Sequence, residues 1–202
     1  MSSSDLVRWG GLAAILAGVL LVVADLLNLA IGFGDEPFSE TATTGIYALQ
    51  SVINFLAAVL LLIGLVGLYA WQSETAGPLG LAGFLVAFLG TALITGFLWA
   101  ALFIVPALAV EVPAFLDEVE GPPPGFFLTL ITFGVGWMLF GIATLLARVY
   151  PRIPTILLMI GAAIAVLPLP FTGIVFAIAV AWLGFALFTG RAASAEQPSR
   201  VR

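Results

Sequence analysis

Long apolar runs dominate the chain, and short polar or turn-forming stretches separate them. A helix needs about 20 apolar residues to cross the hydrocarbon core of a bilayer, and most of these runs reach that length. The pattern therefore predicts an all-α fold, a polytopic transmembrane helix bundle. Its six predicted spans are about 9–31, 45–71, 79–106, 126–149, 153–167 and 171–189.

One transmembrane domain, residues 1–190, takes up nearly the whole chain, and residues 191–202 are predicted to form a disordered cytoplasmic tail. The fifth span has only about 15 residues, roughly 22 Å as a helix, against a core of about 30 Å. Residues 153–189 therefore admit two interpretations, two crossings or a re-entrant hairpin, and their continuous apolarity favours two crossings. The first run also admits a signal-peptide interpretation, although it stays apolar well beyond the candidate cleavage site.

Composition supports a membrane protein and excludes several classes of chemistry. Hydrophobic residues make up 62% of the chain and charged residues 8%, and the mean hydropathy is +1.23. Soluble domains are about a quarter charged. The net charge of −5 argues against nucleic-acid binding, which needs a basic surface. The chain has no Cys and no His, so disulfides, Cys–zinc sites and the usual haem ligand are excluded, and no cofactor is predicted.

The arginines indicate the orientation of the chain, because cytoplasmic loops carry an excess of positive charge. With six spans and both termini cytoplasmic, every arginine lies on the cytoplasmic side: Arg8, Arg148, Arg152, Arg191, Arg200 and Arg202. The same topology places a group of acidic residues outside: Asp35, Glu36, Glu40, Glu111, Asp117, Glu118 and Glu120. We therefore expect a multi-pass protein of the cell membrane. The arginines do not distinguish the two interpretations of residues 153–189.

The junction between the fourth and fifth spans carries a loose family pattern. A Gly-rich helix is followed by Tyr150, Pro151 and Arg152 at an inner turn, and Pro154 then opens the next helix. This arrangement resembles small multi-pass prokaryotic membrane proteins of unassigned function. The resemblance implies a membrane location and transfers no functional residue.

The first span, residues 10–31, contains the one ionisable residue that lies deep inside an apolar run, Asp25. An intramembrane acid is costly and points to function. Asp25 shares a helix face with Gly11, Gly18 and Asn28, and small residues on one face mark close helix–helix packing. We therefore expect this face to point into the bundle. The predicted ligand- or ion-binding cluster in the outer half of the membrane is Asp25, Asn28, Gln50, Asn54, Thr95 and Thr129.

Two interpretations of Asp25 follow. No predicted span contains a cation to pair with it, so we expect the carboxyl to keep its proton at neutral pH. As a functional group, Asp25 would titrate in an outward-facing polar pocket that binds or transports a small solute or ion. As a structural group, it would hydrogen-bond to neighbouring helices in a structural or assembly subunit with no ligand.

The remaining features favour a non-enzymatic protein. No catalytic motif, phosphate loop or dinucleotide fingerprint occurs, and one intramembrane Asp does not make an aspartyl dyad. Trp99, Trp137 and Trp182 are predicted to be buried in the bundle, as packing residues rather than ligand-stacking ones. The expected partners are the lipid bilayer, a small solute or cation, and other subunits of a homo- or hetero-oligomer.

Overall fold

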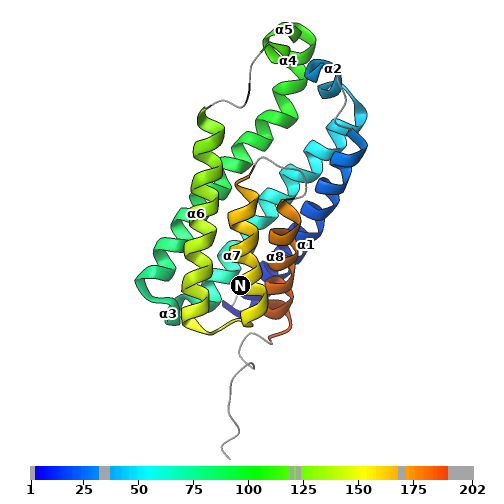
Figure 1. Cartoon of the computed structure of the whole chain (residues 1–202). Coiled ribbons are helices and arrows are strands. Elements are labelled where there is room, and N and C mark those ends of the chain that lie inside the picture. Colours follow the sequence, from blue (N-terminus) through cyan, green and yellow to red (C-terminus); the bar gives the residue numbers. More distant parts are fainter. Residues whose placement is uncertain (1–2, 32–36, 119–120, 122–123, 168–171, 191–202) are drawn as a thin grey trace, which may run out of the picture.

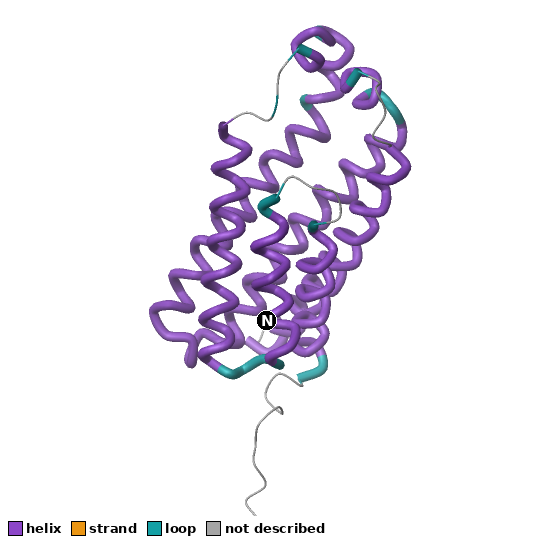
Figure 2. Tube along the Cα trace, in the orientation of Figure 1, coloured by secondary structure: helices purple, strands orange, loops and turns teal. Residues whose placement is uncertain are grey.

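A computed structural model describes residues 3–31, 37–118, 121, 124–167 and 172–190, and all regular secondary structure in these ranges is helical. The long helices align into one elongated bundle, with the short helices α2, α4 and α5 gathered at one end (Figure 1, Figure 2). The helices are α1 (Ser3–Ile31), α2 (Phe38–Ala42), α3 (Gly45–Phe103), α4 (Val105–Glu111), α5 (Pro113–Asp117), α6 (Pro124–Ala147), α7 (Arg152–Ala165) and α8 (Gly173–Phe188).

Helix α3 consists of two arms, residues 45–76 and 78–103, that meet at Gly77. Gly77 has φ 59° and ψ −159°, a conformation that is strained for any residue with a side chain. Pro78 then begins the second arm, where its missing N–H is no loss. Figure 1 shows the chain reversing direction here. The sequence predicts a polar link over residues 72–78, whereas the structure continues the first arm through that link and breaks it only at Gly77.

Three helical segments of the described chain are long and apolar enough to cross a membrane by length and composition: Asp5–Asn28, Gly45–Glu111 and Pro124–Ala147. The second includes both arms of α3. Helices α7 and α8 have 14 and 16 residues, about 21 and 24 Å, which is shorter than a hydrocarbon core of about 30 Å. In Figure 1 the α7–α8 pair stops short of the end that carries α2, α4 and α5.

The described arginines lie at one end of the bundle and four of the described acidic residues at the other, while Asp5 and Glu74 lie at the arginine end. The N-terminal end of α1 and the C-terminal end of α8 lie together (Figure 1). We call this the basic end, because it carries the described arginines, Arg8, Arg148 and Arg152. The other end, here the acidic end, carries Glu40, Glu111, Asp117 and Glu118. The remaining charged residues of the topology prediction, and the predicted tail, lie outside the described residues: Asp35, Glu36, Glu120 and residues 191–202.

Small residues of α1 pack against α3 and α8 at backbone distance. A Cβ built on Gly10 would lie 2.5 Å from the Cα of Gly67, and one on Gly18 would lie 2.4 Å from the carbonyl oxygen of Ala177. Such close approach increases van der Waals contact, which drives helix association in lipid. A similar contact joins α3 to α6, where a Cβ on Gly136 would lie 2.3 Å from the backbone nitrogen of Ala87.

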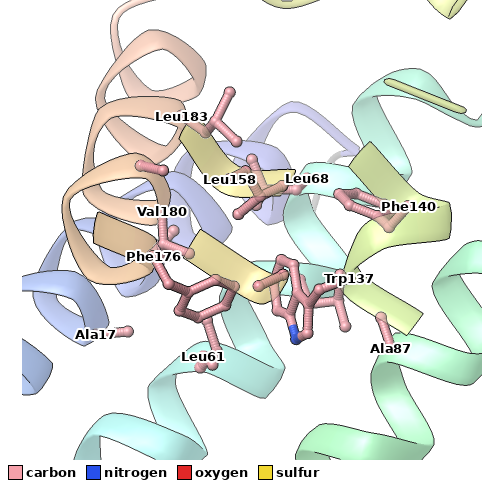
Figure 3. Packing of buried hydrophobic residues seen from close by; sticks show 14 of the residues in the cluster. Ala17, Leu61, Leu68, Ala87, Trp137, Phe140, Leu158, Phe176, Val180 and Leu183 are labelled. Atoms are coloured by element: carbon pink, nitrogen blue, oxygen red, sulfur yellow. The ribbon is translucent and has the colours of Figure 1, made fainter. Parts of the chain in front are cut away.

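The aromatic core lies around Trp137 on α6, whose side chain is fully buried. Figure 3 shows the indole between Phe176 and Phe140, and the Trp137 and Phe176 ring centroids are 4.9 Å apart. The indole Nε1 donates a hydrogen bond to Thr91 Oγ1 at 3.0 Å. The prediction of three buried tryptophans is correct only for Trp137, because Trp99 and Trp182 are 47% and 44% exposed.

The outer surface of the bundle is rich in exposed apolar side chains. Leu128 and Leu146 on α6 are 63% and 69% exposed, and Ile153 on α7 is 63% exposed. Exposed apolar surface on this scale marks a face that contacts a membrane or another protein. Together with the three long apolar helices, it is compatible with insertion into a bilayer.

Candidate functional site

A cavity of about 150 Å³ lies inside the bundle, and we call it the central cavity. Residues from α1, both arms of α3, α6, α7 and α8 line it, and Asp25 is the ionisable residue among them. The lining residues are Leu21, Asp25, Ala58, Leu61, Thr91, Ile94, Leu98, Leu130, Phe133, Ala165, Gly173 and Phe176. A carboxyl group therefore lies in a largely apolar chamber.

Asp25 reaches the first turn of α8. A Cβ built on Gly173 would lie 2.9 Å from Asp25 Oδ2, so the absence of a side chain at position 173 makes room for the carboxyl. The side chain of Thr172, the N-cap residue of α8, forms no capping hydrogen bond with the first turn of the helix. The first turn of a helix has unpaired N–H groups and a positive dipole end, which favour a negative charge nearby.

The carboxyl of Asp25 is nevertheless unsatisfied within the described structure. Its Oδ2 atom is buried and has no hydrogen-bond partner among the described residues. Leaving a buried polar atom unpaired costs about 1–3 kcal/mol, and more when the group is charged. The three described arginines are all at the basic end, with Arg8 in the second turn of α1, Arg148 just after α6 and Arg152 at the start of α7. A buried acid that has no partner among the described residues and lines a chamber is the arrangement expected of a binding group.

The predicted amides pair with each other instead of with Asp25. Gln50 Nε2 donates hydrogen bonds to Asn28 Oδ1 and to the backbone oxygen of Ala24, the latter at 3.3 Å. The Gln50 side chain is buried, and this pair joins the first arm of α3 to α1. Asn54, one turn further along α3, is partly buried. None of these amides lines the central cavity.

The two predicted threonines bond to their own helices. Thr95 Oγ1 donates to the backbone oxygen of Thr91 at 2.8 Å, and Thr129 Oγ1 donates to that of Gly125 at 2.9 Å. The threonine that does line the cavity is Thr91, whose hydroxyl donates to the Ala87 oxygen at 2.7 Å. Of the predicted cluster, the structure thus places only Asp25 in the central cavity.

The sequence gives unequal signals for the cavity residues that the predicted cluster omits. Thr91 lies on the row of residues spaced by four along the second arm, with Gly83 and Ala87, and that row identifies the packed face of the arm. Phe133, Phe176 and Gly173 carry no such signal, because apolar residues and glycines are common throughout these helices. Whether these three residues line a cavity depends on which helices pack against each other.

Other hollows of the structure offer less chemistry. A hollow of about 570 Å³ at the acidic end has no ionisable side chain in its lining. Its lining residues are Phe38, Ala100, Ile104, Val105, Leu108, Phe115, Leu116 and Gly121. Within the described residues, no group of three or more acidic side chains lies close enough together to hold a metal ion. The central cavity is therefore the candidate functional site.

Comparison with known proteins adds no relative, since no protein-family model, curated protein or solved structure matches the chain. The fold and the cavity define a class of protein: an all-helical bundle whose three long apolar helices are compatible with membrane insertion.

Proposed function

We propose that this is a six-span protein of the cell membrane, with both termini in the cytoplasm, that binds a small organic cation in the central cavity and carries it across the bilayer. The unsatisfied carboxyl of Asp25 is the observation that carries the proposal. A carboxyl group that has no partner among the described residues can release its proton when a cation enters the chamber, and the resulting ion pair is strong there because the surroundings are apolar.

The chemistry of the lining favours an organic cation over a metal ion. Magnesium and calcium require six or more oxygen ligands, whereas the cavity offers the Asp25 carboxyl and the Thr91 hydroxyl, which is already bonded to Ala87 and Trp137. Phe133 and Phe176 line the cavity, and their ring centroids are 5.1 Å apart. Aromatic faces beside a carboxylate suit an alkylammonium group.

The size of the cavity limits the ligand. A volume of about 150 Å³ is roughly that of five water molecules and lies below the range of about 300–1,000 Å³ usual for drug-sized ligands. Methylammonium and tetramethylammonium are therefore suitable probes.

The alternative, a structural or assembly subunit, would use the Gly and Ala faces as its working surface. In the structure these faces contact other helices of the same chain, as Gly10 does with Gly67 and Gly18 with Ala177. They are therefore occupied within the protomer, which supports the binding function over the assembly function.

The binding test compares wild type with Asp25→Asn, which keeps the shape of the side chain and removes its ability to ionise. In detergent, tetramethylammonium at 100 times its Kd is expected to stabilise the wild type by about 2.7 kcal/mol, a rise in Tm of about 5–10 °C. We expect Asp25→Asn to show no rise beyond that given by sodium chloride at equal ionic strength. Thermal unfolding monitored by helical circular dichroism measures both.

The matched control is Glu118→Gln, which removes one negative charge from an exposed residue at the acidic end. This variant is expected to respond to tetramethylammonium as the wild type does. Equal responses of Asp25→Asn and the wild type would refute the proposed site, and so would the absence of any response to methylammonium and tetramethylammonium in the wild type.

The proposed topology predicts a labelling pattern, and the absence of native cysteines makes it simple to measure. In intact cells, a membrane-impermeant maleimide is expected to label Glu118→Cys at the acidic end and to leave Ser73→Cys, near the Gly77 turn, unlabelled until the membrane is permeabilised. Leu167→Cys, at the tip of the α7–α8 pair, is labelled in intact cells if that pair crosses the bilayer fully. Labelling of Ser73→Cys from outside would overturn the orientation.

A further inference from the structure

A second hollow, of about 320 Å³, lies at the basic end beside the turn between α6 and α7, and we call it the basic pocket. It combines two arginines with aromatic and aliphatic side chains. Its lining residues are Arg148, Tyr150, Pro151, Arg152, Ile153, Pro154 and Trp182. The central cavity shares none of these residues, so the basic pocket requires its own explanation.

Arg148 occupies an unusual backbone position. It follows the last residue of α6 with φ 56°, in the left-handed region, and its backbone N–H donates to the Thr144 oxygen at 3.2 Å. Glycine is the usual residue at this position of a helix C-terminus, because a side chain is disfavoured there. The chain places an exposed arginine there instead, at the edge of the pocket.

The turn that carries the two arginines is anchored to the bundle. Tyr150 is 4% exposed, and its hydroxyl donates to the backbone oxygen of Leu68 on the first arm of α3 at 3.1 Å. Burial raises the pKa of the Tyr150 hydroxyl well above its usual value, so it remains a neutral donor at physiological pH. The anchor fixes the turn between Arg148 and Arg152 and so limits the freedom that ligand binding would have to remove.

The start of α7 adds further donors. Pro151 is the N-cap residue and makes no side-chain hydrogen bond to the helix. The backbone N–H groups in the first turn of a helix favour an anion nearby, and in α7 residues 152 and 153 carry them, since Pro154 has none. The Thr155 hydroxyl does not cap them, because it donates to the Pro151 oxygen at 2.9 Å. Two guanidinium groups beside these N–H groups are well suited to a phosphate, which arginine binds with two parallel hydrogen bonds.

The pocket also has an apolar wall that is exposed at the protein surface. Trp182 on α8 and Ile153 on α7 are 44% and 63% exposed, and both line the pocket. A free phosphate ion would gain nothing from this wall, whereas an acyl chain would pack on it. Tryptophan is also enriched where membrane proteins meet the headgroup region.

We propose that the basic pocket binds an anionic phospholipid, with its phosphate held by Arg148, Arg152 and the start of α7 and its acyl chain along Trp182 and Ile153. Basic pockets between helices on the cytoplasmic side of membrane proteins bind lipids of this class. The inference rests on the membrane location in the proposed function and is independent of Asp25.

Titration of the detergent-solubilised protein with phosphatidylglycerol, followed by native mass spectrometry, tests this proposal. Each basic residue near a membrane surface contributes about fivefold in affinity. We therefore expect the double variant Arg148→Gln/Arg152→Gln to bind phosphatidylglycerol at least about tenfold more weakly than wild type. Phosphatidylcholine, which is zwitterionic, is expected to bind both proteins weakly and equally.

The matched control is Arg8→Gln, which removes a positive charge from the same end of the bundle but outside the pocket, where Arg8 lies 5.3 Å from the centre of the Phe188 ring. It is expected to retain the affinity of wild type for phosphatidylglycerol. Trp182→Ala, which leaves both arginines in place, is expected to weaken phosphatidylglycerol binding and to leave the binding of inorganic phosphate unchanged.

Three outcomes would overturn the lipid site: equal phosphatidylglycerol affinity in the double variant and in wild type, an equal loss in Arg8→Gln, or inorganic phosphate competing as strongly as the lipid. The cysteine-labelling experiment reports membrane insertion without involving the pocket. If the wild type labels as predicted but does not prefer phosphatidylglycerol to phosphatidylcholine, the lipid site in the basic pocket is rejected and the membrane location is not.

Discussion

Replacing Asp25 by leucine is expected to raise the thermal stability of the protein and to abolish its response to small organic cations. The Oδ2 atom of Asp25 is buried without a partner among the described residues, beside an apolar chamber. Removing an unsatisfied buried polar group recovers about 1–3 kcal/mol, which corresponds to a rise in Tm of roughly 2–12 °C for a chain of this size. The leucine side chain can occupy part of the central cavity.

This experiment distinguishes a binding group from a structural one. A residue that hydrogen-bonds neighbouring helices stabilises the bundle, so its replacement by leucine should lower the Tm. A residue kept for binding carries a stability cost, and its replacement should raise the Tm while function is lost. Thermal unfolding in detergent, with and without tetramethylammonium, measures both effects in one series.

Asn28→Leu is the matched control for this variant, since Asn28 lies one turn away on the same helix. Its side-chain oxygen accepts a hydrogen bond from the buried Gln50 amide. Leucine at this position removes one of the two acceptors of that buried amide and leaves only the Ala24 oxygen, so we expect a loss of about 1–3 kcal/mol. A lower Tm for both variants would mean that Asp25 is structural and would refute the interpretation of its carboxyl as a binding group.

Replacing Gly136 by alanine is expected to destabilise the bundle by about 1–3 kcal/mol or more, the usual cost of overpacking a tight contact. A Cβ at this position would lie 2.3 Å from the backbone nitrogen and 2.5 Å from the Cα of Ala87. Because these are backbone atoms, the contact is relieved only if α6 and the second arm of α3 move apart. Thermal unfolding of the purified protein measures the loss.

The control for Gly136→Ala is Gly96→Ala. Both glycines lie inside helices, so both substitutions gain the same helix propensity, about 0.5–1 kcal/mol. A Cβ on Gly96 would meet no atom within 4 Å. We therefore expect Gly96→Ala to be neutral or slightly stabilising. Equal stabilities for the two variants would show that α3 and α6 do not pack at backbone distance in solution.

The sequence alone was sufficient to predict an all-helical fold, because the apolar runs are long and the breaks between them carry Gly, Pro or charge. It did not predict the short helices α2 and α4. The breaks at Gly77 and before α7 fall where glycine or proline punctuation indicates them. The small residues of α1 correctly predicted a packed face, since a Cβ on Gly11 would lie 2.8 Å from the backbone nitrogen of Phe188 and one on Gly18 would lie 2.4 Å from the carbonyl oxygen of Ala177, both on α8. The sequence also separated the charges, and the described arginines and outer acids lie at opposite ends of the bundle.

Only the tertiary structure decided which residues surround Asp25. The carboxyl lies against Gly173 of α8, whereas the nearby amides of Asn28 and Gln50 pair with each other. Likewise, one tryptophan of the three in the core prediction is buried. The physical reason is that the sequence of a helix that is apolar on every side says little about which face of the helix points into the bundle. The rotation of such a helix is set by the positions where two backbones can touch, and this depends on glycines and alanines that are far apart in the chain.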